Sequence, residues 1–335
     1  MARNFKKNRP LALVNHALAA IVLVASGAAC AQTGAAAYPT KPVKLVVGFA
    51  AGGPTDVVAR AFADHASKAL GQPFIIDNKP GAGTIIAAQA VASAPADGYT
   101  LLFGATNHTM IPALYQGRVK FDAVKSFRPL CTVAGSPTVL VVASGLPVKT
   151  LADYQAKARA EPGRVTAGTA GVGSSGHFAT EIFARAQGLQ LNHVPYKGAA
   201  PVVTDLMGGQ LDSSFATLGS VLPQIQSGKL RALAVGTAQR SALIPDVPTF
   251  AEAGGGNYSA DVWFGVLAPA GLPEPIALAL ERTAADFAKS PSTIDKLRGL
   301  GLDAESVCGN AFASRVAREV TTYSQVAKAL DLKVD

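Results

Sequence analysis

Two glycine-containing loops in this sequence have the composition of turns that bind small anions. Residues 49–56 read FAAGGPTD, residues 170–177 read AGVGSSGH, and each loop follows a short apolar run. Glycine lets the backbone approach a ligand closely, and a helix that begins after such a loop directs N–H groups and its positive dipole end at that ligand. We therefore predict an anion site with these candidate contacts: Gly52, Gly53, Pro54, Thr55, Asp56, Gly171, Gly173, Ser174, Ser175 and His177.

A simpler interpretation remains open for both loops, that of a tight strand-to-helix turn. In the first loop Thr55 is the expected N-cap of the helix. The second loop also has the GxGxxG spacing of dinucleotide sites, which need an acidic residue at the end of the next strand. Residues 191–196 contain no acidic residue, so we expect no nucleotide cofactor.

Ser174 and His177 raise a second possibility, a hydrolase or transferase that uses the serine as nucleophile and the histidine as base. Neither Ser174 nor Ser175 lies in the GxSxG elbow of serine hydrolases. A histidine at such a place more often faces a ligand or caps the helix in its neutral form. We keep catalysis as the alternative and predict a protein that is not an enzyme.

Two further segments follow predicted strands, one with Asn107 and the other with Tyr196 and Lys197. Ligands of open parallel sheets bind at the carboxyl ends of the strands, so these segments should face the same crevice as the two loops. Asn107 and Tyr196 therefore join the candidate contacts, with turn-forming and surface roles as the open alternative. Lys197 fits a solvent-exposed lysine better than an anion contact.

Short apolar runs that alternate with longer helical patterns place these loops in a fold. Strands are predicted at 43–49, 74–76 and 99–104, with helices at 56–70 and 84–94 between them. This βαβαβ order is typical of a parallel sheet that helices cover on both faces.

A second α/β unit follows Pro129, and a tail completes the chain. With 335 residues, the length suggests two lobes. The tail is too short for a core of its own, so it should return to the first unit, with crossings between lobes near 134–137 and 258–261. The predicted strands are 139–143, 165–168, 191–194, 211–215, 230–235 and 262–267, and the predicted helices are 151–160, 175–187, 200–208, 274–288 and 310–330.

The first 31 residues have the layout of a secretory signal peptide. Four cations precede the mostly apolar residues 11–24, and Ala29-Cys30-Ala31 provides a cleavage site after Ala31. Lipidation at Cys30 is a weaker possibility, because Gly27 stands where a lipobox normally has leucine. Removal of residues 1–31 takes away four cations and no acid, which lowers the formal charge from +8 to +4. The remaining cations are scattered, so nucleic-acid binding is not expected.

Cys131 and Cys308 would remain in an oxidising compartment. They form either a disulfide or two buried thiols, and the sequence leaves both open. The four histidines of the mature chain lack helical ligand spacing and neither cysteine has a CxxC partner, so no metal site is predicted.

Taken together, these motifs resemble those of the Bug family, the TctC-like extracytoplasmic solute receptors of tripartite tricarboxylate transporters. The resemblance runs from about Tyr38 to the C-terminus. Five motifs occur in family order: 49–56 (FAAGGPTD), 78–83 (NKPGAG), 95–100 (PADGYT), 194–198 (VPYKG) and 246–249 (DVPT).

The resemblance implies an α/β, two-lobed periplasmic binding protein of type II topology. Each lobe is then a mainly parallel sheet flanked by helices, and the cleft between the lobes closes on a small organic carboxylate. Backbone N–H groups and hydroxyls of residues 52–56 and 173–175 would hold one carboxylate, with ordered water helping. The implied domains are a signal peptide at 1–31, lobe 1 at 38–134 plus 260–335, and lobe 2 at 135–259.

The implied partners are that carboxylate and the membrane subunits of a tripartite tricarboxylate-type transporter, with the receptor acting as a monomer without cofactor or metal. A binding protein used for sensing would have the same sequence features and remains an alternative. Two departures from many relatives concern the pocket: Ala216-Thr217 stands in place of an Asp-Asn pair, and Ile111 in place of Asn before Pro112. Thr217 is therefore a candidate contact, and a monocarboxylate or aromatic acid is favoured over an amino acid or tricarboxylate.

Overall fold

The computed structural model describes residues 1–2, 38–115, 117–256 and 261–329. Lys41–Asp335 form one compact unit, and Met1–Thr40 form another, of which residues 1–2 and 38–40 are described. The predicted signal peptide, its cleavage site and Cys30 therefore lie outside the described residues.

The strands are built mainly from β-branched and apolar residues, and most of their side chains are buried. They are β1 (Val43–Val47), β2 (Phe74–Asn78), β3 (Thr100–Ala105), β4 (Phe127–Ala143), β5 (Thr166–Thr169), β6 (Asn192–Pro195), β7 (Ser213–Thr217), β8 (Leu230–Val235), β9 (Asp261–Pro269) and β10 (Asp303–Ala304).

Helices follow most of these strands, in the alternation that the apolar pattern predicts. They are α2 (Pro54–Leu70), the short 3-10 helix η1 (Ala82–Thr84), α3 (Ile85–Ala92), α4 (Asn107–Leu114), α5 (Leu151–Ala160), α6 (Ser175–Ala186), α7 (Ala199–Met207), α8 (Leu218–Gln226), α9 (Glu274–Lys289), α10 (Pro291–Gly299) and α11 (Gly309–Ala329).

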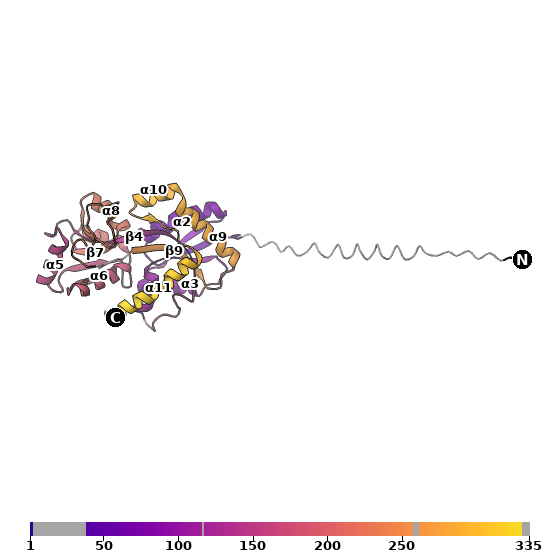
Figure 1. Cartoon of the computed structure of the whole chain (residues 1–335), viewed down its shortest axis with the longest axis horizontal. Coiled ribbons are helices and arrows are strands. Elements are labelled where there is room, and N and C mark those ends of the chain that lie inside the picture. The colour runs from indigo at the N-terminus through magenta and orange to yellow at the C-terminus, as the bar shows by residue number, and fades with distance from the viewer. Residues whose placement is uncertain (3–37, 116, 257–260, 330–335) are drawn as a thin grey trace. The chain divides into compact units, whose positions relative to one another are not determined.

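The strands form two lobes, which confirms the predicted α/β class. The first lobe has the order β2-β1-β3-β9, with β1 parallel to β2 and β3, and β9 antiparallel to β3. The second lobe has the order β7-β5-β6, in which all three strands are parallel. Its remaining strand, β8, pairs antiparallel with β4. Figure 1 shows β4 and β9 running between the two groups.

Strand β4 belongs to both lobes and is much longer than predicted. It pairs with β9 as far as Pro137 and with β7 from Thr138, so its partner changes at the predicted crossing. The prediction of a strand only at 139–143 was wrong because Pro129 and Pro137 interrupt the apolar pattern. Strand pairing tolerates them here, since the register with β9 shifts next to Pro129. Residues 258–260 of the second predicted crossing lie outside the described residues.

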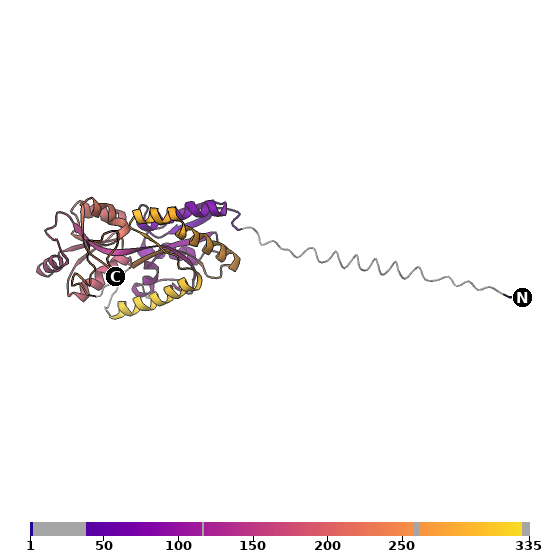
Figure 2. The ribbon, with the colours of Figure 1, turned by 45° about the horizontal axis from the view of Figure 1, so that its top comes forward.

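Helices cover both faces of the first lobe. Phe62 of α2 contacts Phe103 of β3 and Phe287 of α9, whereas Trp263 of β9 packs against Phe312 of α11. Figure 2 shows α11, in yellow, on the opposite side of this lobe from α2. The C-terminal tail thus completes the core that the N-terminal βαβαβ segment begins.

Three helices and one short strand lie where no element was predicted. Helix α4 replaces a predicted loop at Asn107, and α8 contains Gly219 and Pro223, residues that disfavour helix. Seven of the eight residues of α4 are buried, so tertiary packing stabilises a helix that has no amphipathic pattern. Helix α10 and strand β10 were also missed.

A disulfide joins Cys131 of β4 to Cys308, the residue before α11. This result decides between the two alternatives that the sequence left open. The bond ties the last helix to the strand that both lobes share.

Candidate functional site

A pocket lies where the carboxyl ends of β1, β3, β5 and β7 meet the helices that follow them. This is the edge at which ligands of open α/β sheets bind. Both glycine loops contribute to the same pocket, as predicted from their positions after strands. The predicted site residues that line it are Gly53, Pro54, Thr55, Asn107, Ser174, Ser175 and Thr217.

The first loop enters the pocket through a glycine in an unusual conformation. Gly52 has a φ of +90°, which is available to glycine at little cost. Gly53 is the N-cap and Pro54 the first residue of α2, so the prediction that Thr55 caps the helix was wrong. Proline suits this place because its fixed φ is helical and the N–H that it lacks would have no partner within the helix.

Asp56 does not line the pocket but holds the first loop from behind. Its side chain is 3% exposed, and it accepts hydrogen bonds from Gly52 N (3.0 Å), Asn78 Nδ2 (2.9 Å) and Arg60 Nε (2.8 Å). Burial opposes its ionisation, but the hydrogen bonds from Arg60, Gly52 and Asn78 outweigh burial and lower the pKa of Asp56. The carboxylate is therefore committed to the protein's own groups.

The second loop is organised in the same way around α6. Gly171 and Gly173 have φ values of +128° and +79°, and Ser174 is the N-cap, whose Oγ accepts from His177 N at 3.3 Å. Ser174 and Ser175 line the pocket, whereas Gly173 and His177 do not. The backbone of Gly173 donates to His177 Nδ1 at 3.2 Å, so the imidazole supports the loop.

The ring of His177 is held neutral. It stacks on the ring of His193 at 4.2 Å between centroids, and burial together with His193 lowers its pKa to about 3. The hydroxyl of Ser174 accepts from the main-chain N–H of His177, and Nδ1 of that imidazole accepts from Gly173. These are the contacts of a helix cap and differ from the serine-to-imidazole hydrogen bond of a hydrolase.

Tyr196, Gly171 and Gly52 lie beside the pocket. Gly171 and Tyr196 line an adjoining cavity that shares Phe49, Ala170 and Ser174 with it, and Gly52 lines a second neighbouring cavity. The hydroxyl of Tyr196 donates to Asp205 at 2.6 Å, and this bond raises the pKa of Tyr196 to about 12. Tyr196 therefore uses its hydroxyl to hold α7.

The two lobes touch next to the pocket through strand-end loops and through Tyr115, the residue that follows α4. Ala50 N donates to Lys197 O at 3.2 Å, and Tyr115 Oη donates to Val172 O at 3.4 Å. Gly198 faces Ala50 so closely that an added Cβ would lie 3.4 Å from the Cβ of Ala50. Main-chain atoms of both lobes thus approach each other at the edge of the pocket.

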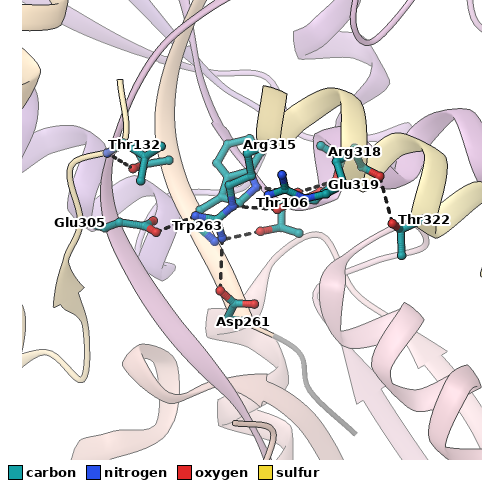
Figure 3. Close-up of polar contacts among 11 residues, drawn as sticks. Thr106, Thr132, Asp261, Trp263, Glu305, Arg315, Arg318, Glu319 and Thr322 are labelled. Carbon is teal, nitrogen blue, oxygen red and sulfur yellow. Dashed lines mark hydrogen bonds and ion pairs between the residues drawn. The ribbon is translucent and has the colours of Figure 1, made fainter. Parts of the chain in front are cut away.

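A partly buried polar network centred on α11 holds Thr106 and Thr109, the residues on either side of Asn107 and His108. Figure 3 shows Thr106, Trp263, Arg315 and Glu319 of this network. Trp263 N donates to Oγ1 of Thr106, the residue before α4, at 2.8 Å. Glu319 Oε2 accepts from Trp263 Nε1 at 2.9 Å and from Thr109 Oγ1 at 3.1 Å. The amide of Asn107 itself donates to Thr84 Oγ1.

Arg315 of α11 completes this network and extends it to Asp261, the first residue of β9. It pairs with Glu319 (2.8 Å), Glu305 (2.6 Å) and Asp261 (3.2 Å), which come from three different elements or their ends. Helix α11 thereby connects β9 to α4, the helix that carries Asn107.

Several pocket residues were not among the predicted contacts. Gly176 packs so closely on β7 that a Cβ would collide with the carbonyl oxygen of Phe215. Its place in the GxGxxG spacing was a signal that could have found it, whereas Ser220 lies in the unrecognised helix α8. The missed lining residues are Phe49, Ala105, Ala170, Gly176, Ala199, Val202, Val203, Ser214, Phe215, Ala216, Ser220, Val262 and Phe264.

The chemistry of the pocket combines anion-binding ends with apolar walls. Among the described residues, its lining includes no lysine, arginine, aspartate or glutamate. The N-terminal turns of α2, α6, α7 and α8 all contribute residues, and such turns carry N–H groups without helical partners and a partial positive charge. A small carboxylate can be bound there without a cationic side chain, and Phe49, Phe215 and Phe264 give the walls an apolar surface.

The described ranges contain neither a cluster of metal-ligating side chains nor a helix that could span a membrane. Within them, no group of three or more His, Cys, Asp or Glu side chains is arranged to hold a metal ion. None of the helices in the same ranges is long and apolar enough to cross a bilayer.

Two lobes joined by shared strands, with a pocket at facing helix N-termini, define the class of solute-binding proteins. Comparison with known proteins identifies the family within that class. Residues 58–332 match the model of the tripartite tricarboxylate transporter family receptor, and the chain belongs to this family. Protein BugT of Bordetella pertussis is 32% identical over 314 residues, which cover 93% of this chain and 96% of BugT.

Solved structures agree with this assignment. An R. palustris protein solved with adipate is 37% identical, with a TM-score of 0.85 over 89% of this chain and all of the other. MatC from Rhodopseudomonas palustris, solved with bound malate, is 30% identical, with a TM-score of 0.82 over 86% of this chain and 99% of MatC.

Proposed function

We propose that this protein is an extracytoplasmic receptor that captures a small organic carboxylate and delivers it to the membrane subunits of a tripartite tricarboxylate-type transporter. The observation that carries the proposal is the pocket shared by Gly53 and Ser174, the N-caps of two helices that face it from different lobes. The adipate and malate of the related structures support a carboxylate as ligand.

The lining of the pocket favours one class of carboxylate. Seven polar residues without charge lie among apolar side chains, and a second or third carboxylate would find no cationic side chain within the described lining. We therefore propose a ligand with one carboxylate at the helix N-termini and an apolar or aromatic body against Phe49, Phe215 and Phe264. The proposed contacts are the residues that were predicted from the sequence and that also line the pocket: Gly53, Pro54, Thr55, Asn107, Ser174, Ser175 and Thr217.

A binding assay tests this proposal. Acetate, benzoate, succinate, adipate, malate and citrate, here called the acid panel, are added separately to the purified protein while its melting temperature is followed. A ligand at about 100 times its Kd adds about 2.7 kcal/mol of stability, so a true ligand raises the melting temperature measurably. We expect benzoate to exceed citrate. If no acid of the panel shifts the transition, and native mass spectrometry of the purified protein shows no retained acid, the proposal fails.

Chemical analysis of the acids in the same samples distinguishes a receptor from a hydrolase or transferase. A receptor returns its ligand unchanged, so analysis of the acid after incubation should recover all of it. The contacts of Ser174 and His177 favour this outcome, because Nδ1 of His177 is already bonded to Gly173. Turnover of an acid or its ester that depends on Ser174 would establish an enzyme instead.

Export and assembly complete the proposal. We propose cleavage after Ala31, a periplasmic monomer, and lobes at 38–134 plus 260–335 and at 135–259. The mass of the secreted protein should correspond to a chain that begins at Gln32, whereas lipidation would retain a modified Cys30. Genes for membrane subunits beside the gene for this chain would support transport over sensing.

A further inference from the structure

Asp56 and His177 hold equivalent positions in the two loops of the pocket. Each is the third residue after the N-cap of its helix, Gly53 in α2 and Ser174 in α6. Each accepts, through its side chain, the N–H of a glycine four residues earlier in the chain. That glycine directly precedes the N-cap in both loops.

The two glycines share a backbone conformation as well as a partner. Gly52 has a φ of +90° and Gly173 a φ of +79°, and their N–H groups lie 3.0 Å from Asp56 Oδ2 and 3.2 Å from His177 Nδ1. A left-handed glycine turns the chain sharply, so fixing its N–H fixes the direction in which the N-cap enters the pocket. The acceptor four residues later is what holds that turn.

The acceptors differ in charge, and the surroundings of each account for the difference. The negative charge of Asp56 is met by the guanidinium of Arg60, which contacts both carboxylate oxygens. His177 instead stacks on His193, whose Nε2 lies 2.7 Å from Thr169 Oγ1. An uncompensated carboxylate at position 177 would stand directly behind the N-terminus of α6 and oppose an anionic ligand, whereas a neutral imidazole accepts the same hydrogen bond without this repulsion.

We propose that His177 is a positioning residue, whose neutral imidazole holds residues 171–174 in the conformation that binds the ligand carboxylate, as Asp56 does for the first loop. The carboxylate in this statement rests on the proposed function, and the role of His177 in the loop does not. The geometry requires an unprotonated Nδ1, and therefore places the ring proton on Nε2. It also gives part of the GxGxxG spacing a use other than phosphate binding or catalysis, because Gly173 is the donor to His177.

Substitution of His177 by asparagine and by leucine separates an acceptor from a merely bulky side chain. The side-chain oxygen of asparagine takes about the place of Nδ1, whereas leucine keeps volume and loses the acceptor. Amide hydrogen exchange of Gly173 is followed by ¹H–¹⁵N NMR, with the Gly52 amide as internal control. In His177→Leu we expect about tenfold faster exchange at Gly173, unchanged exchange at Gly52, and about tenfold weaker binding of the panel acid that binds best.

His177→Asn should retain both properties within about threefold. The proposal is overturned if Gly173 exchanges in His177→Leu as slowly as in the parent protein, or if the asparagine variant exchanges as fast as the leucine variant. If no acid of the panel binds the parent protein and native mass spectrometry shows no retained acid, the proposed function fails, while the Gly173 exchange still decides the role of His177.

A measurement on the unmodified protein covers the case in which the leucine variant does not fold. Long-range ¹H–¹⁵N spectra of the imidazole should show a protonated Nε2 and a bare, hydrogen-bonded Nδ1 for His177. A proton on Nδ1 is incompatible with the bond from Gly173 and would overturn the proposal.

Discussion

Gly53 and Ser174 are the N-caps of α2 and α6, and they line one pocket although they belong to different lobes. Each follows a glycine with positive φ, and each is the point at which a helix N-terminus meets the pocket. Binding of the proposed carboxylate at this place would therefore depend on the two lobes together.

Gly53→Val should weaken ligand binding without unfolding the protein. Gly53 has a φ of −82°, so the backbone admits a side chain, and a Cβ would lie 3.8 Å from Ala199. The two methyl groups of valine would take up pocket volume, and we expect about tenfold weaker binding of the best panel acid. Gly53→Ala is the matched control and should bind more tightly than the valine variant. Equal affinities in parent and valine variant, measured by calorimetry, would remove this loop from the site.

Glu319→Ala should destabilise the protein and loosen α4. The substitution leaves Trp263 Nε1, Thr109 Oγ1 and Arg315 without their shared acceptor. We expect a loss of about 2–3 kcal/mol in the free energy of unfolding, since the carboxylate is largely buried among charged and polar partners. Glu319→Gln keeps an acceptor and should lose less. Urea unfolding curves of the three proteins measure this, and an alanine variant as stable as the parent would show that the network contributes little.

Removal of the disulfide should lower stability more than most single substitutions. Replacement of Cys131 and Cys308 by alanine frees a loop of 177 residues in the unfolded chain and unties α11 from β4. The expected loss is about 2–5 kcal/mol, measured by denaturant unfolding without reductant. Peptide mapping without reduction should recover the two cysteines in one linked fragment. Separate fragments would contradict the bond.

Acid should destabilise the protein between pH 6.5 and about 4. Burial lowers the pKa of His108 to about 4 and that of His177 to about 3, from an ordinary value of 6.5. The unfolded chain therefore binds protons that the folded chain excludes, so stability is complete above pH 6.5 and falls as the pH falls. Each of the two histidines contributes about 1.4 kcal/mol per pH unit through this window.

Two carboxylates act in the opposite direction over part of that range. Burial raises the pKa of Glu281 and of Glu305, which stabilises the folded state as they become protonated. The contribution of His177 is separated from those of His108 and of His193, whose pKa burial also lowers to about 4, by comparison with His177→Asn. The melting temperature of this variant should fall less steeply with acid. Parallel curves for the two proteins would show that His177 does not resist protonation.

The candidate site was predictable where its residues follow a strand and precede a helix. Glycine, proline and serine mark such turns in the sequence, which is why Gly53 and Ser174 were found. The roles of Asp56 and His177 were not predictable in the same way, because the sequence does not show that their side chains turn back to glycines of the loops. Ser220 was missed because Gly219 and Pro223 disfavour a helix in the sequence, so α8, whose stability comes from packing, was not predicted.

The alternation of strands and helices, and the loops between them, can be read from local residues, since side-chain period, glycine and caps act over a few positions. Only the folded chain shows that β9 lies between β3 and β4, which brings Val262 and Phe264 into the pocket. The same holds for the Cys131–Cys308 bond and for the network around Arg315. These features depend on pairing between segments far apart in the sequence, and the physical preference for each pairing exists only once the sheet that aligns them has formed.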